Sequence, residues 1–201
     1  MRRTILVLSA ATLALAACST PTTNGTPTPT SGRTSPNPST STPGVPKVEH
    51  PIDVARFKRA PCDALTKAQI EDLLGPDTET VPRDGGAGPA CRWSIPSTSR
   101  PLIDAIFADL PDSGTAKFYE GKGTTYKLLE PLEPIDGYPV TAYDVNDNRA
   151  KGDCSVALGT SDTQTIGISL VQSEANVGTK DPCAAAREAA VRVLATIRGG
   201  N

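Results

Sequence analysis

The sequence predicts an α+β domain, a twisted antiparallel sheet of about five strands with an N-terminal and a C-terminal helix packed on it. Two helical segments with clear start and stop signals bracket the region from 66 to 199. Between them, apolar residues recur at every second position in short segments, and the connections have hairpin length, which implies antiparallel pairing. Four cysteines are placed so that two disulfides could tie each helix to a nearby strand.

The first predicted helix is the segment TKAQIEDLL. Thr66 and Gln69 have the spacing of a capping box, and Leu65 and Ile70 stand at the positions of a hydrophobic staple. Gly75 supplies the C-terminal stop. Because this helix is short, it needs a partner surface to be stable.

Five segments are predicted to form strands: 91–95, 102–110, 138–145, 154–160 and 164–172. The last two are joined at Ser161-Asp162 and should form a hairpin. A short helix with Ala116, Phe118 and Tyr119 is expected between the second and third strands.

The segment DPCAAAREAAVRVLATIRGG has the strongest helix signals in the chain. Asp181 is suited to the N-cap, Pro182 to the first helical position and Gly199 to the end. Its apolar residues follow one stripe, as expected for a helix packed on a sheet: Cys183, Ala186, Ala190, Val193, Leu194 and Ile197.

Residues 1–17 have the features of a secretory signal peptide. Arg2-Arg3 precedes 13 residues that are apolar apart from two hydroxyl side chains. That run is too short for a bilayer, which takes about 20 residues. The pair of arginines also allows a twin-arginine export signal, although the residues that follow fit it poorly.

The sequence LAAC, which ends at Cys18, resembles the bacterial lipobox. The resemblance implies cleavage before Cys18 and two acyl chains, such as palmitate, on its sulfur. Two chains make a stable membrane anchor. We therefore expect a lipoprotein held at the outer face of the cell membrane. The alternative is a plain signal peptide followed by a chance cysteine.

Residues 18–46 are predicted to form a disordered tether behind the lipidated cysteine. From 19 to 46, fourteen of 28 residues are Ser or Thr and seven are Pro, and Arg33 carries the only charge. Such a segment has almost no apolar surface to bury, so ordering it would cost entropy without a compensating gain.

Residues 47–201 are predicted to form a single domain. They contain all 22 acidic residues and 17 of the 20 basic ones, a net charge of about −5. With no basic cluster, nucleic acid is excluded as a partner. After Cys18 no apolar run is long enough for a second membrane segment, and no cofactor motif is present.

Four cysteines remain in this domain, an even number that argues for two disulfides in an exported protein. Three pairings can be drawn. We favour Cys62–Cys91 with Cys154–Cys183, because each pair then closes a separate loop. Zinc and redox roles are the rival interpretations, but the cysteines do not stand in close pairs and there is no Cys-x-x-Cys.

Few residues point to chemistry, and no catalytic or metal-binding residue is predicted. His50, the only histidine, lies before the first disulfide. The segment 144–148, DVNDN, matches half of a calcium loop but lacks its glycine and glutamate, so a polar loop is favoured. The segment 83–88, RDGGAG, lacks the end of a phosphate loop and is expected to be mobile. Trp93 is assigned to the core.

The cysteine contexts resemble one known family. They are PCD with LT at a helix start, CRW in a strand, then Cys154, and DPC at the start of the last helix. Together with the lipobox and the Thr/Pro-rich tether, they resemble the actinobacterial lipoproteins called domain-of-unknown-function 3558. The resemblance covers about residues 62–197 and implies an actinobacterial cell envelope and two sequential disulfides, but no activity.

These observations favour a non-enzymatic binding domain that interacts with an envelope protein. The alternative is a carrier or sensor of a lipid or other small apolar ligand, which would need an apolar pocket of about 300 Å³ or more. An envelope hydrolase is the third hypothesis, although no catalytic constellation is visible in the sequence.

Overall fold

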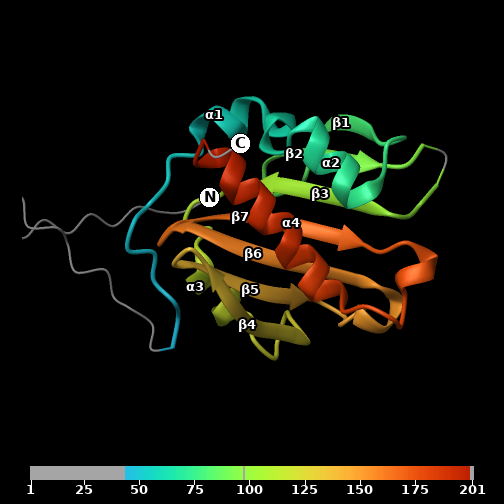
Figure 1. Cartoon of the computed structure of the whole chain (residues 1–201). Helices are drawn as coiled ribbons and strands as arrows, with labels where there is room; N and C mark the ends of the chain where they lie inside the picture. Colours follow the sequence, from blue (N-terminus) through green and yellow to red (C-terminus); the bar gives the residue numbers. More distant parts are fainter. Residues whose placement is uncertain (1–43, 97, 200–201) are drawn as a thin grey trace, which may run out of the picture. The chain divides into compact units, whose positions relative to one another are not determined.

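A computed structural model describes residues 44–96 and 98–199 of the chain. In this part, one antiparallel sheet has the strand order β1-β2-β3-β7-β6-β5-β4 (Figure 1). The strands are β1 (Glu79–Asp84), β2 (Pro89–Ser94), β3 (Leu102–Phe107), β4 (Leu128–Ile135), β5 (Tyr138–Asp144), β6 (Asp153–Ser161) and β7 (Gln164–Val171). The predicted α+β class is confirmed, but the sheet has seven strands where about five were expected.

The two strands that the sequence analysis missed are the two edges of the sheet, β1 and β4. β1 contains Pro82 and all six of its residues are exposed, so it shows no alternation of apolar residues. β4 contains Pro131 and Pro134. Proline cannot donate a hydrogen bond to a neighbouring strand, and is therefore tolerated at an edge. The same prolines hinder the addition of a further strand to either edge.

Four α-helices accompany the sheet in the described residues: α1 (Ala55–Arg59), α2 (Lys67–Leu74), α3 (Thr115–Glu120) and α4 (Pro182–Ile197). Three short 3₁₀ helices connect other elements: η1 (Pro61–Ala64), η2 (Arg149–Lys151) and η3 (Glu174–Asn176). The helices at α2, α3 and α4 were predicted, whereas α1 was not.

The start of α2 has the predicted capping box. The Thr66 backbone N–H donates to Gln69 Oε1 at 2.8 Å, and the Gln69 N–H donates to Thr66 Oγ1 at 3.3 Å. Leu65 and Ile70, the two staple residues, are buried. Gly75 ends the helix with a φ of 106°, a value that favours glycine.

Helix α4 crosses one face of the sheet over β6 and β7 (Figure 1). The Cys183 N–H donates to the side chain of its N-cap residue, Asp181, at 2.8 Å. The predicted apolar stripe faces the sheet and is buried up to Leu194. Ala186 and Ala190 have no exposed surface, so the helix approaches the strands closely and a larger side chain would not fit there.

Two disulfides are present in the domain. Cys62 of η1 is bonded to Cys91 of β2, and Cys154 of β6 is bonded to Cys183 of α4. The first holds the segment before α2 on the sheet. The second holds the first turn of α4 on the sheet. Both therefore lie on the same, helix-covered face.

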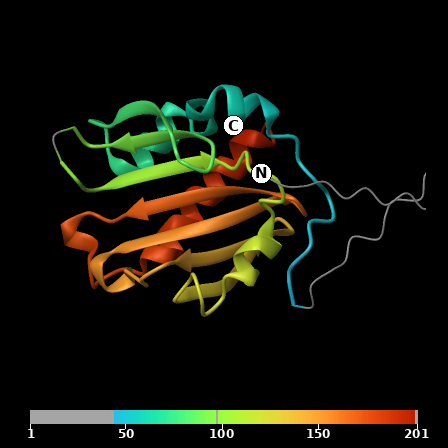
Figure 2. The same ribbon diagram turned by 180° about the vertical axis from the view of Figure 1, so that it is seen from behind.

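In the part of the chain that the structure describes, the short helix α3 is the one α-helix on the opposite face of the sheet (Figure 2). Small side chains lie there on the central strands, and Ser155 and Ser169 share a hydrogen bond of 2.8 Å. Phe118, Tyr126 and Tyr143 form an aromatic cluster beside them, with ring centroids 4.6–5.7 Å apart. Packing against α3 therefore covers only part of this face.

The segment that enters the domain is attached at one end of the β6–β7 hairpin. The Val48 N–H donates to Asp162 Oδ1 at 3.0 Å, and the Ile52 N–H donates to Thr160 O at 2.9 Å. Val48 is buried. The segment 48–52 thus lies at the turn end of this hairpin, opposite to the end that carries the Cys154 disulfide.

Replacing Cys154 and Cys183 together by serine should lower the free energy of unfolding by about 3 kcal/mol, because the disulfide restricts a loop of the unfolded chain. Urea denaturation of the oxidised proteins measures the loss. The double replacement Cys62→Ser and Cys91→Ser is the matched comparison. It should cause a loss of similar size, since its loop has the same sequence separation of 29. A variant as stable as the wild type would contradict this role of the bond.

Candidate functional site

A half-open hollow of about 440 Å³ lies where α2, β7 and α4 meet, next to η3. Six of its eleven lining residues are apolar: Leu73, Leu74, Pro101, Leu170, Val171 and Ala185. The polar residues stand among them and are Gln172, Ser173, Asn176, Lys180 and Glu188. The hollow is the candidate site of this domain because its walls are more apolar than those of the other hollows described below.

Side-chain contacts between α2 and α4 fix the two helical walls relative to each other. Thr196 Oγ1 donates to Gln69 Oε1 at 3.0 Å. Arg192 pairs with Asp72 at 3.0 Å and with Glu188 of the rim at 3.2 Å. Glu188 therefore already has a cationic partner.

Arg100 holds the loops on the strand side of the hollow. Its Nη1 donates to the carbonyl oxygens of Lys151 and Gln172 at 2.9 and 3.3 Å. It also pairs with Asp153 and Glu174, each at 3.3 Å. One guanidinium thus joins the start of β3 to η2, β6, the end of β7 and η3.

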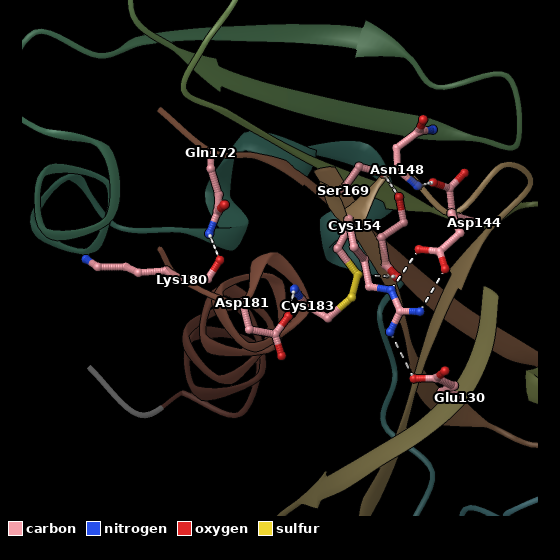
Figure 3. Close-up of a disulfide and its surroundings, with 12 residues drawn as sticks. Glu130, Asp144, Asn148, Cys154, Ser169, Gln172, Lys180, Asp181 and Cys183 are labelled. Carbon is pink, nitrogen blue, oxygen red and sulfur yellow. Dashed lines mark hydrogen bonds and ion pairs between the residues drawn. A yellow bond between two sulfur atoms is a disulfide. The ribbon is translucent and has the colours of Figure 1, made fainter. Parts of the chain in front are cut away.

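Gln172 fixes the chain between β7 and α4. Its N–H donates to Gly152 O at 2.9 Å, and its Nε2 donates to Lys180 O at 3.2 Å (Figure 3). Gln172 is 4% exposed. The Lys180 side chain extends away from the Cys154–Cys183 disulfide in the same view. Among the described residues, its ammonium has no carboxylate within ion-pair distance.

Two other hollows adjoin α2 and have more polar walls. One of about 430 Å³ is lined by the ion pair Arg56–Asp63, with Thr66 and Thr196. The other, of about 340 Å³, is lined by Lys67 and Glu71 among others. Charged and hydroxyl groups on these walls favour water over an apolar occupant.

The half calcium motif at 144–148 is a hydrogen-bonded turn. The Asp144 carboxylate accepts from the N–H groups of Asn146 and Asn148 at 3.1 and 2.7 Å. Arg149 donates twice to Asp147, at 2.7 Å each, and these hydrogen bonds lower the pKa of that carboxyl group. Within 44–96 and 98–199, no group of three or more His, Cys, Asp or Glu residues is arranged to hold a metal ion.

The glycine-rich segment 83–88 is not the free loop that was expected. Arg83 and Asp84 belong to β1, and the turn that follows packs on the end of β3. The Asp109 N–H donates to Ala87 O at 2.9 Å, and a side chain at Gly88 would collide with the carbonyl oxygen of Phe107. The close approach of two backbones explains the glycine.

The family described as "Protein of unknown function (DUF3558)" matches residues 13–196 of the chain. The chain belongs to this family. No curated protein and no solved structure matches it. Membership in DUF3558 supports the resemblance inferred from the cysteine contexts, and it assigns no activity.

The remaining residues singled out in this DUF3558 chain do not gather at one site. The imidazole of His50 is exposed, while its backbone oxygen accepts a hydrogen bond from Tyr138 Oη at 2.8 Å. Trp93 is completely buried on the helix-covered face, as assigned. Cys18, with the predicted signal peptide and most of the tether, lies outside the described residues. In the described ranges, no helix has the length and apolar character needed to cross a membrane.

Sequence reasoning did not assign the hollow. Leu73 and Leu74 were predicted only as residues of the first helix, and Ala185 only as a residue of the last helix. No role was predicted for Lys180, because a single lysine before a helix cap is an ordinary surface residue. The one available signal was the pair of leucines at the end of a short helix that needs a partner surface.

Burial in the aromatic cluster raises the pKa of Tyr143 from its ordinary value to about 12. The neutral phenol therefore contributes stability that is complete below pH 10 and is lost as the pH rises from 10 to about 12. Between pH 8 and pH 11, the unfolding free energy of the wild type should fall by about 1 kcal/mol more than that of Tyr143→Phe.

Urea denaturation of the wild type and Tyr143→Phe at the two pH values measures this difference. Tyr119→Phe on α3 is the control, since its ring lies outside the cluster. Equal pH dependence in the wild type and Tyr143→Phe would show that Tyr143 is not buried in this way.

Proposed function

We propose that this protein is a lipoprotein of an actinobacterial cell envelope, anchored by acylated Cys18 at the outer face of the membrane, and that it binds a partner protein without catalysing a reaction. The charged start, apolar run and LAAC sequence support the anchor. The Ser/Thr/Pro-rich composition of residues 19–46 supports a tether that holds the domain at a distance from the membrane.

The half-open apolar hollow carries the binding proposal. Its leucine walls offer a partner a place to bury an apolar side chain. Disulfides, helix–helix contacts and Arg100 hold those walls in place before any partner arrives. A prearranged surface loses little entropy on binding, which favours recognition.

A second candidate function is the transport or sensing of a small apolar ligand. The volume of about 440 Å³ is large enough for it. However, pockets for small ligands cover about 70–90% of the ligand surface, whereas this hollow is half open. The geometry therefore favours a side chain that projects from a larger body.

Photo-crosslinking in living cells tests the proposal. A photoreactive amino acid in place of Ser173, on the rim of the hollow, should give one reproducible protein adduct. The same amino acid in place of the exposed Thr163, in the turn at the other end of the β6–β7 hairpin, is the matched control and should not give this adduct. No reproducible neighbour from position 173 would refute a protein partner.

Native mass spectrometry of the same protein, extracted gently from its membrane, separates the two functions. The proposed function predicts the mass of the chain from residue 18 plus its acyl anchor. An additional lipid or metabolite mass would identify a carrier. An N-terminal peptide without acyl groups on Cys18 would overturn the proposed anchor.

A further inference from the structure

We propose that the hollow recognises a polypeptide segment in which a large apolar side chain lies directly beside a carboxylate, such as an apolar C-terminal residue. This inference rests on the proposed function and specifies the chemistry of its partner. It follows from three properties of the hollow: its apolar walls, its half-open shape and the unpaired charge at its rim.

The apolar part of the segment is selected by the walls. Leu73 and Leu74 are half-buried at the end of α2, and Leu170 is 7% exposed at the end of β7. Ala185 is the small residue of α4 that leaves the space between them. An aliphatic or aromatic side chain placed there removes leucine surface from water, which is the main source of favourable free energy at such a contact.

The charge of the segment is selected by Lys180. Glu188 and the neighbouring Arg100 already have partners of opposite charge, since Glu188 pairs with Arg192 and Arg100 pairs with Asp153 and Glu174. Among the charged residues that line the hollow, Lys180 is therefore the one whose partner is not supplied by the described chain. A carboxylate next to the seated side chain complements it. Because the ammonium is exposed, the pair contributes selectivity more than strength.

The position of Lys180 is fixed by the backbone. Its carbonyl oxygen accepts from the buried amide of Gln172 at 3.2 Å, and the next residue, Asp181, caps α4. The Lys180 backbone is thus fixed beside the apolar walls, whereas its ammonium lies at the free end of an exposed side chain. The competing mode, addition of a strand from the partner, is hindered at both sheet edges by Pro82 and by Pro131 and Pro134.

The test is an NMR titration of the ¹⁵N-labelled mature chain carrying Cys18→Ser, with three probes. These are N-acetyl-Leu-Leu with a free carboxylate, the same dipeptide as its C-terminal amide, and decanoate. We expect the acid dipeptide to shift the amide signals of 73–74, 170–176 and 180–188. It should bind about two- to fivefold more tightly than the neutral form, as one exposed ion pair allows.

Two pairs of variants make the test specific. Lys180→Glu should abolish the preference for the acid over the amide. Lys127→Glu should keep it, because this exposed lysine precedes the edge strand β4 and does not line the hollow. Ala185→Trp should fill the hollow and remove binding of both dipeptides. Ala184→Trp, on the exposed neighbouring position of α4, should not.

Three outcomes would overturn the inference: equal binding of acid and amide, shifts confined to other residues, or decanoate binding more tightly than either dipeptide. If position 173 gives a protein adduct but the acid and the amide bind equally, only the preference for a carboxylate is refuted. The proposed function then stands. The absence of any adduct would refute the proposed function itself.

Discussion

The structure depends on the packing of α4 across the sheet and on the covalent bond that holds its first turn there. Ala186 and Ala190 let the helix lie close to the central strands, and Cys183 joins it to Cys154 of β6. Because α4 forms one wall of the hollow and positions α2 through Thr196 and Arg192, the shape of the hollow follows from this one placement.

The two ends of the domain are suited to different tasks. The segment from Val48 to Ile52 is bound to the turn end of the β6–β7 hairpin, where the proposed tether would join the domain. The hollow lies at the other end of the same hairpin, about 20 Å away along β6 at about 3.3 Å per residue. A partner could therefore occupy the hollow without contacting the entry point of the tether.

Local signals made much of this fold predictable. The Thr66–Gln69 capping box, the Asp181-Pro182 helix start and the alternation in β6 and β7 each act within a few residues, and each gave the observed element. The even number of cysteines in the domain, together with the expectation of export, predicted two disulfides. The turn Asp136-Gly137, with both φ angles positive, was the overlooked signal for the β4–β5 hairpin.

The rest could not be obtained from local signals. β1 is a strand because it pairs with β2, and its own residues are exposed and interrupted by Pro82. The hollow unites Leu73 with Leu170 and Lys180, which lie about a hundred positions later in the chain and reach it only through the sheet topology. No spacing rule in the sequence marks such a site, because its members act through shape and one unpaired charge rather than through a motif.

Gln172, Arg100 and the start of α4 hold the chain between β7 and α4, so the hollow should exist in the absence of the proposed partner. Amide hydrogen exchange of the intact mature protein tests it most directly. The amides of Gln172, Asn176 and Lys180, which are hydrogen-bonded in the structure, should be protected from exchange. Arg100→Ala should reduce this protection. The amides in the middle of α4 should stay as protected as in the wild type. Exchange across 172–180 at the rate of an unstructured peptide would contradict the account.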